Sequence, residues 1–108
     1  MSQTPNLDQI VLINTFTVKS ENADALLAIL AEATENVMRH RPGVVSATFH
    51  LSFDRRHVAN YARWRSKADF DVTMSDPTKE HMGKAGRLAE HFEPILYTVA
   101  HDEQRAAP

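Results

Sequence analysis

Cysteine is absent from this 108-residue sequence, and its absence excludes several kinds of chemistry. Without cysteine the chain forms no disulfide, supplies no thiolate nucleophile and offers no sulfur ligand to zinc or an iron–sulfur cluster. Its histidines and carboxylates do not compensate, because the sequence contains no His-x-x-x-His or His-x-His motif and no cluster of carboxylates. We therefore expect neither a metal site nor another bound cofactor.

Long apolar runs and a strong charge of one sign are also missing. No run approaches the roughly 20 apolar residues that span a bilayer. Residues 1–9 have neither the basic nor the apolar part of a signal peptide. The net charge of −2 gives no basic surface for nucleic acid or anionic lipid. These features predict a cytoplasmic protein that binds neither nucleic acid nor a membrane.

Four segments have the composition and spacing of β-strands. Residues 10–18 are rich in β-branched and aromatic types and are apolar on both faces, which predicts a strand covered on both sides. Residues 44–53 alternate between apolar and polar, and residues 57–65 return after a short charged hairpin loop. The last strand is predicted at 95–101, directly after Pro94.

Two helical regions separate these strands. After Ser20, a candidate N-cap, apolar residues recur at helical spacing for about five turns, until a Pro-Gly pair ends the helix. The second region begins at Ser66, which forms a variant capping box with Asp69. It is interrupted at 75–77 and resumes over 78–90.

The resulting order, β-α-β-β-α-β, indicates a ferredoxin-like α+β fold with a four-stranded antiparallel sheet. The length suits one domain, expected over residues 9–101, with flexible termini at 1–8 and 102–108.

A homodimer follows from the two-sided apolar character of the strands. Two helices cover one face of the sheet, so the other apolar face would meet water in a monomer, which is unusual for a soluble protein. Burial gains about 25 cal/mol per Å², so two such faces are expected to pack together. A monomer is the alternative if Thr15, Thr17, His50 and Ser52 keep that face sufficiently polar.

Two stretches carry a resemblance to a known family. Residues 42–50 (PGVVSATFH) and 60–70 (NYARWRSKADF) contain Pro-Gly-hydrophobic and Trp-x-Ser pieces. The chain, over roughly residues 9–100, thereby resembles the antibiotic biosynthesis monooxygenase family, and the Asn-Tyr-Ala-x-Trp piece is most similar to its quinone-forming members. The resemblance implies a dimeric α/β barrel with a substrate cavity between sheet and helices. It also implies oxidation of a phenolic, hydroquinone or anthrone-type aromatic molecule by O₂ to a quinone, without metal, flavin or haem.

Asn60 and Trp64 are the first candidates for catalysis. They lie four residues apart on one predicted strand, so they face the same way. The resemblance places both in the cavity, where an amide or an indole N–H can donate to a substrate carbonyl or a peroxide oxyanion. Spacing alone favours a core tryptophan with a satisfied N–H and an asparagine paired with backbone, and it is the resemblance that favours a role in catalysis. His81 is the candidate general base, since it falls in the second helical region.

The remaining candidates are expected to line the cavity. Phe70 stands where the quinone-forming members carry a tyrosine, and Lys84 is the nearest cation to their helix-two arginine. Asn14 matches a first-strand asparagine of haem-degrading relatives. The full set of expected substrate-binding residues is Asn14, Phe16, Phe49, Phe70, Met74, Lys84 and His91.

Other functions on the same fold stay open at this point. A non-catalytic small-molecule-binding or stress-response barrel would need no chemistry from these residues. A haem-degrading monooxygenase is less well matched, because Thr73 occupies the position of its tryptophan and Met82 that of its axial histidine. Isomerase or lactone chemistry is compatible with the fold, since fold does not determine function.

Overall fold

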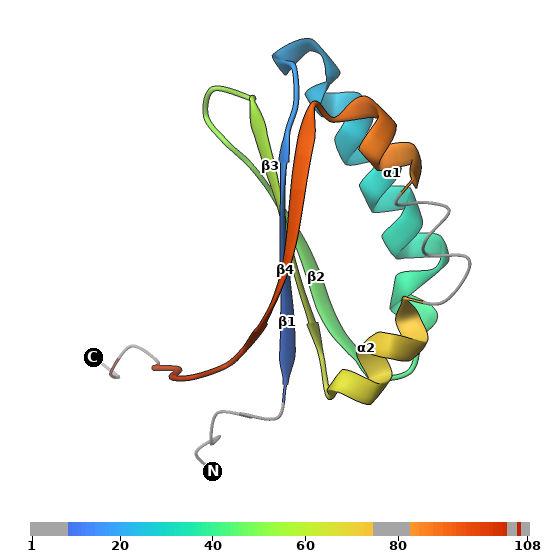
Figure 1. Ribbon diagram of the computed structural model, residues 1–108, viewed down its shortest axis with the longest axis vertical. Helices are drawn as coiled ribbons and strands as arrows, with labels where there is room; N and C mark the ends of the chain where they lie inside the picture. Colours follow the sequence, from blue (N-terminus) through green and yellow to red (C-terminus); the bar gives the residue numbers. More distant parts are fainter. Residues whose placement is uncertain (1–8, 75–82, 104–105, 107–108) are drawn as a thin grey trace.

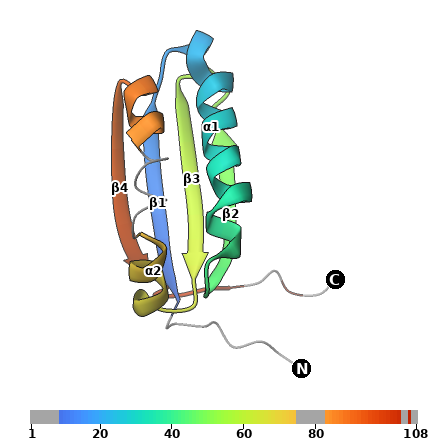
Figure 2. The ribbon, with the colours of Figure 1, turned by 90° about the vertical axis from the view of Figure 1, so that its right-hand side faces the viewer.

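The computed structural model describes residues 9–74, 83–103 and 106. One antiparallel sheet forms a layer, and the helices lie together on one of its faces (Figures 1 and 2). The sheet order is β2-β3-β1-β4. The strands are β1 (Ile10–Thr17), β2 (Val44–Leu51), β3 (His57–Trp64) and β4 (His91–Thr98). This arrangement confirms the predicted ferredoxin-like α+β fold.

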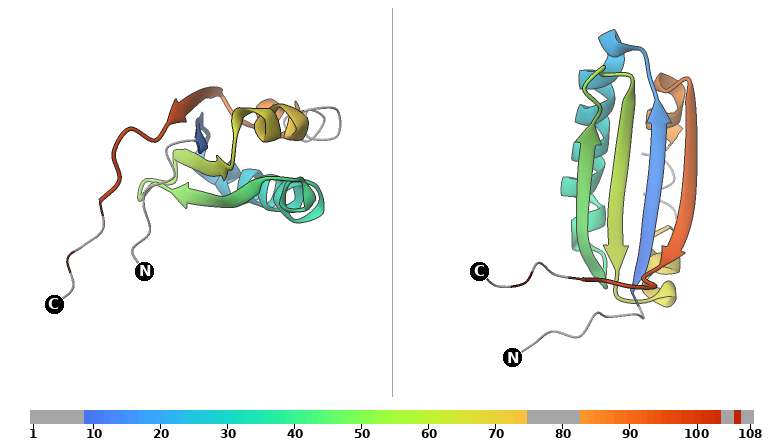
Figure 3. Two further views of the ribbon diagram at one scale, coloured as in Figure 1. Left: turned by 90° about the horizontal axis from the view of Figure 1, so that it is seen from below. Right: turned by 90° about the vertical axis from the view of Figure 1, so that its left-hand side faces the viewer.

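The helical layer consists of α1 (Ala23–Asn36), α2 (Lys67–Thr73) and the helical residues 83–88. Seen from the opposite side, no helix in the described part of the chain covers the sheet (Figure 3, right). The two faces of the sheet therefore have different surroundings, with a helical layer on one and none on the other.

The predicted start of the last strand is wrong, because β4 begins at His91 and contains Pro94. Proline cannot donate a backbone hydrogen bond, so it normally lies outside a strand or on an edge. β4 is an edge strand that pairs only with β1, and this position accommodates the missing donor.

The limits of the first helix also differ from the prediction. Ser20 does not cap it; Ser20–Asn22 form a 3₁₀ turn, η1, and α1 starts at Ala23. The helix ends at Asn36 and is followed by a second 3₁₀ turn, η2 (Met38–His40). At 14 residues, α1 is nearer four turns than five. The Ser66 cap of α2 is confirmed, since its Oγ accepts from the Asp69 backbone N–H at 3.2 Å.

The core between sheet and helices is made of two hydrophobic clusters. The first, called the upper cluster, consists of Phe16, Val18, Ala23, Leu26, Leu30, Val58 and Ala85. The second, called the lower cluster, consists of Leu12, Met38, Ala62 and Trp64. Both draw on alternate residues of β1 and β3, because successive side chains of a strand point to opposite faces.

Gly43 joins η2 to β2 in a conformation that favours glycine, with φ of +81°. A Cβ there would also overlap the side chain of Asp69. We expect Gly43→Ala to lower the free energy of unfolding by at least about 1–2 kcal/mol, the usual cost of a left-handed backbone for a residue with a Cβ. Urea unfolding at fixed protein concentration measures the change. Gly83→Ala is the matched control, because nothing lies within 4 Å of its added Cβ; an equal loss in both variants would contradict the explanation.

Candidate active site

Two asparagines face each other across the middle strands of the sheet. Asn14 of β1 and Asn60 of β3 are Cα partners in register, so their side chains share a face. That face is the helix-covered one, and both residues are buried, with 0% and 3% exposure. The structure thus brings together two residues that sequence reasoning had assigned separately. Asn60 came from the stretch that contains Trp-x-Ser, and Asn14 came from its match to a first-strand asparagine of haem-degrading relatives.

Three of the four polar side-chain atoms of this pair have no partner in the described part of the chain. Neither polar side-chain atom of Asn14, nor Oδ1 of Asn60, has a hydrogen-bond partner among the residues described. A buried polar group without a partner costs about 1–3 kcal/mol. The arrangement therefore favours a polar group of a ligand, or water, between the sheet and the helices.

Apolar side chains border the amide pair on both sides along the strands. Phe16 and Val58 of the upper cluster lie one step beyond the pair on the same face, and Leu12 and Ala62 of the lower cluster lie one step before it. The amide pair is therefore a polar interruption between the two clusters. Phe49, the Cα partner of Asn60 on β2, packs against the upper cluster.

Trp64 is fully buried in the lower cluster, and its indole donor is already used. Nε1 donates to Oγ1 of Thr73 at 2.9 Å, and that hydroxyl donates to the backbone carbonyl of Asp69 at 3.1 Å. The ring meets Phe70 edge to face, with centroids 4.9 Å apart, and Met74 packs against the same cluster. Trp64 thus has the geometry of a core residue with a satisfied N–H.

Thr73, which accepts the hydrogen bond of the Trp64 indole, was noted by sequence reasoning only as a mismatch to haem-degrading relatives. It is buried, with 0% exposure, on the helix that follows Trp64. Its position four residues after Asp69 places its hydroxyl over the preceding turn of α2. The sequence did contain a signal for this buried hydrogen bond, because Thr73 is a polar β-branched residue on the apolar side of a short helix.

Three further candidates are not brought to the amide pair by the described structure. Lys84 is exposed on the helical residues 83–88. His91 is exposed at the start of β4, where its partner Thr17 belongs to the other face of the sheet. His81 lies outside the described residues.

The polar residues that are buried as a whole in the described chain are neutral, whereas the cationic Arg63 is half-buried, with its Nε shielded from solvent. The wholly buried residues are Asn14, Asn60 and Thr73, and none of their side chains titrates. The described residues hold no group of three or more histidines, aspartates or glutamates suited to a metal ion. They also contain no helix long and apolar enough to cross a membrane. The pair can therefore donate and accept hydrogen bonds, but it cannot remove a proton.

Comparisons with known proteins agree with this fold and show the family of the chain. A family model described as antibiotic biosynthesis monooxygenase matches residues 9–85. Tetracenomycin-F1 monooxygenase of Streptomyces glaucescens is 40% identical over 105 residues, which cover 97% of this chain and 94% of that protein.

Solved structures show the same fold at lower identity. The ActVA-Orf6 monooxygenase of Streptomyces coelicolor, in complex with nanaomycin D, has a TM-score of 0.79 and 23% identity, over 95% of this chain and 96% of that one. SnoaB of Streptomyces nogalater, a cofactor-independent oxygenase, has a TM-score of 0.72 and 21% identity, over 88% and 96%. The match of the family model and the 40% identity over nearly the whole chain place this protein in the antibiotic biosynthesis monooxygenase family and make it a monooxygenase, an oxidoreductase.

Proposed function

We propose that this protein is a cytoplasmic, cofactor-independent monooxygenase that oxidises a phenolic, hydroquinone or anthrone-type aromatic molecule with O₂ to a quinone. The observation that carries the proposal is the buried Asn14–Asn60 pair between two apolar clusters, in which both polar side-chain atoms of Asn14 and Oδ1 of Asn60 have no partner among the described residues. A flat aromatic molecule with oxygen substituents matches both parts of this environment. The relative named for tetracenomycin F1, and the nanaomycin D bound in the structure of the ActVA-Orf6 monooxygenase, support the proposed class of substrate.

The reaction needs no reductant besides the substrate. For an anthrone, a base removes a proton and leaves an electron-rich anion, which passes electrons to O₂ and forms a carbon–peroxide bond. Cleavage of the O–O bond leaves one oxygen on carbon as the carbonyl and releases the other as water. The carbon loses two hydrogens and gains one oxygen, a four-electron oxidation that equals the reduction of O₂.

In this reaction the amides act as hydrogen-bond donors. An N–H of Asn60 or Asn14 stabilises the negative charge that develops on the substrate oxygen and then on the peroxide. Because they are fixed on adjacent strands and screened from water, they require no reorganisation when that charge appears.

Oxygen uptake with anthrone tests the proposal. We expect one O₂ consumed per anthraquinone formed, one ¹⁸O atom in the product when ¹⁸O₂ is used, and unchanged turnover after treatment with EDTA. Asn60→Ala is expected to lower kcat by about 10²-fold, the effect of removing one donor to an oxyanion. Binding of phenols without oxygen consumption, over a panel of such compounds, would instead establish a non-catalytic small-molecule-binding protein. A Soret band after haem addition, followed by its loss with reductant, would establish a haem-degrading monooxygenase.

His81 is our proposal for the general base, since the amides cannot take a proton and no ionisable side chain is buried among the described residues. We expect kcat to rise with pH, because a base must be unprotonated to accept a proton, and His81→Asn to abolish that rise. His101→Asn is the matched control, because His101 is exposed and pairs with Glu103 near the end of the described chain. An identical pH profile in His81→Asn would remove this residue from the mechanism.

We further propose that the uncovered sheet face forms a homodimer. Val11 with Tyr97 and Ile13 with Ile95 are cross-strand partners on that face, and Ile95 and Tyr97 are 42% and 43% exposed. Sedimentation should give twice the mass of the 12.2 kDa chain, and Ile95→Arg should shift it to the monomer. Phe53→Ser is the control, because Phe53 is a fully exposed apolar residue beyond the end of β2, outside that face. A wild-type monomer at micromolar concentration would contradict the proposal.

A further inference from the structure

Two residues of opposite charge lie on the uncovered face of the sheet. Arg63 of β3 directly precedes the buried Trp64, and Glu93 of β4 is the register partner of Thr15, which follows the buried Asn14. Because successive side chains of a strand point to opposite faces, Arg63 and Glu93 point away from the helices, on the face that Figure 3 (right) shows. No other residue on that face of the four described strands carries a permanent charge.

Arg63 is held against this face without an anion. Its Nη2 donates to Oε1 of Gln9, and its Nε is shielded from solvent with no partner among the described residues. The residue is half-buried, so its charge has lost part of its hydration. A carboxylate binds a guanidinium more strongly than a neutral amide does. Arg63 can therefore still bind a carboxylate, and the exposed Glu93 takes part in no ion pair of the described structure.

The two charges are too far apart to pair within one protomer. Arg63 is the register partner of Val11, and Glu93 is that of Thr15, on the strand β1 that lies between β3 and β4. Two strand spacings across the sheet and four residues along it separate their Cα atoms by about 17 Å. Ile13 lies midway between them, because it is on β1 and halfway between the two register positions. Each charge therefore needs a partner from outside its own protomer.

The centre of this face, around Ile13, is apolar. Tyr61 of β3 and Ile95 of β4 are the register partners of Ile13. Interfaces between protein chains commonly have an apolar centre and a polar rim. A two-fold axis that passes this centre parallel to the sheets, at right angles to the line from Arg63 to Glu93, brings each Arg63 opposite the partner's Glu93. The charges of the face are thus complementary to those of a second copy of the chain.

We propose that each Arg63 pairs with the partner's Glu93 in the homodimer proposed above, on which this inference rests. A symmetric interface of this kind makes every contact twice, so the dimer contains two such ion pairs. Burial of the apolar centre is not directional and tolerates several orientations of the two sheets. Opposite charges at two positions of the rim select one of these orientations and disfavour the others.

Exchange of the two charges tests the pairing without relying on turnover. At low ionic strength, where screening is weak, Arg63→Glu and Glu93→Arg should each raise the dissociation constant of the dimer about 10²-fold, because like charges then meet twice. An equimolar mixture of the two variants should form a mixed dimer about as tight as the wild type, since both of its contacts join opposite charges. The double variant with both changes should also recover the dimer. Sedimentation measures the affinities, and native mass spectrometry separates the mixed dimer from the two homodimers.

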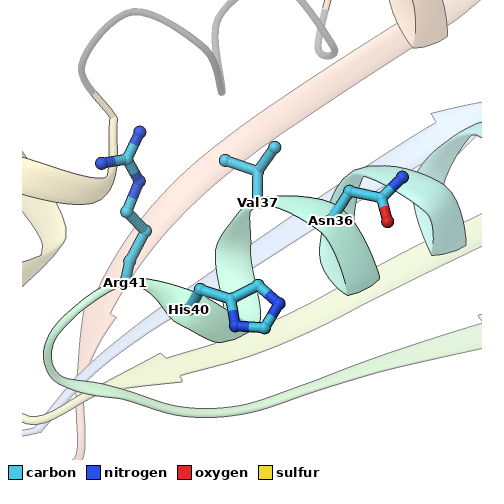
Figure 4. Close-up of a pocket in the computed structure, with 4 residues that line it drawn as sticks. All are labelled: Asn36, Val37, His40 and Arg41. Atoms are coloured by element: carbon cyan, nitrogen blue, oxygen red, sulfur yellow. The ribbon is translucent and has the colours of Figure 1, made fainter.

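Arg41→Glu and Glu21→Arg are the matched controls, and neither should change the dissociation constant of the dimer. Arg41 is half-buried like Arg63, but it lies at an open depression by the carboxyl-terminal end of α1, on the helical side of the sheet (Figure 4). Glu21 is exposed in η1.

A mixture that associates no better than the single variants would overturn the pairing, as would single variants that dimerise like the wild type. If a charge reversal prevents folding, Arg63→Gln and Glu93→Gln replace it, and a double-mutant cycle of the dissociation constants must then show coupling between the two positions. A monomeric wild type would overturn the homodimer and the pairing together. A wild-type dimer without recovery in the mixture would overturn the pairing alone.

Discussion

The double variant Asn14→Val with Asn60→Val is expected to be more stable than the wild type and almost inactive. The three unpartnered polar atoms of the pair are replaced by methyl groups of similar bulk, which removes the penalty of burying them. Valine also suits the centre of a sheet. We expect the free energy of unfolding to rise by about 1–3 kcal/mol, and kcat to fall by about 10²–10³-fold because the oxyanion donors are lost.

Urea unfolding at a fixed protein concentration and oxygen uptake with anthrone measure the two effects. Asn22→Val is the matched control; it makes the same chemical change at η1, outside the buried layer, and should alter neither quantity by much. A double variant less stable than the wild type would mean that the amides support the fold. Full activity in the double variant would remove them from the chemistry.

A gain in stability with a loss of activity is the signature of a site rather than of a core. Replacing a residue that serves packing lowers the stability of the protein. A group kept for function often lowers that stability while it is present. The Asn14–Asn60 pair has the second character, since its neighbours Phe16, Val58, Leu12 and Ala62 are all apolar and closely packed. The prediction therefore separates the two explanations of the pair in one experiment.

Much of this fold was predictable because its signals are local. Residue composition, alternation and a hairpin loop predicted three of the four strands closely, and the Ser66 cap appears as expected. The errors in the prediction also have physical causes. Pro94 was taken as a strand boundary because it cannot donate a hydrogen bond, but its cost depends on whether the strand is at an edge, and only the sheet order reveals that.

The candidate site was predictable in part for a similar reason. The shared face of Asn60 and Trp64 follows from strand geometry, and both are buried on it. The pairing of Asn14 with Asn60 requires the register of β1 against β3, which no local pattern supplies. Lys84 was chosen from the resemblance and His91 from its place at the second helical region, and the exposure of both depends on how residues 83–88 and β4 pack.

The largest expected effect on stability belongs to Trp64, which fills the lower cluster and has its N–H bonded to Thr73. Trp64→Ala is expected to cost about 3–5 kcal/mol, as large-to-small changes in cores do. Thr73→Val should cost about 1–3 kcal/mol, because it leaves the buried indole donor without a partner. These figures correspond to melting points lowered by several degrees per kcal/mol in a domain of this size.

A double-mutant cycle of Trp64→Phe and Thr73→Val decides what the indole donor does. If its partner is Thr73, as at 2.9 Å in the structure, Thr73→Val costs much less once Trp64 is already phenylalanine, and the coupling is at least about 1 kcal/mol. Trp64→Phe then changes kcat far less than Asn60→Ala, because phenylalanine keeps the edge-to-face neighbour of Phe70 and loses only a donor already in use. Zero coupling together with a large loss of kcat in Trp64→Phe would show instead that the indole N–H turns to the substrate during the reaction.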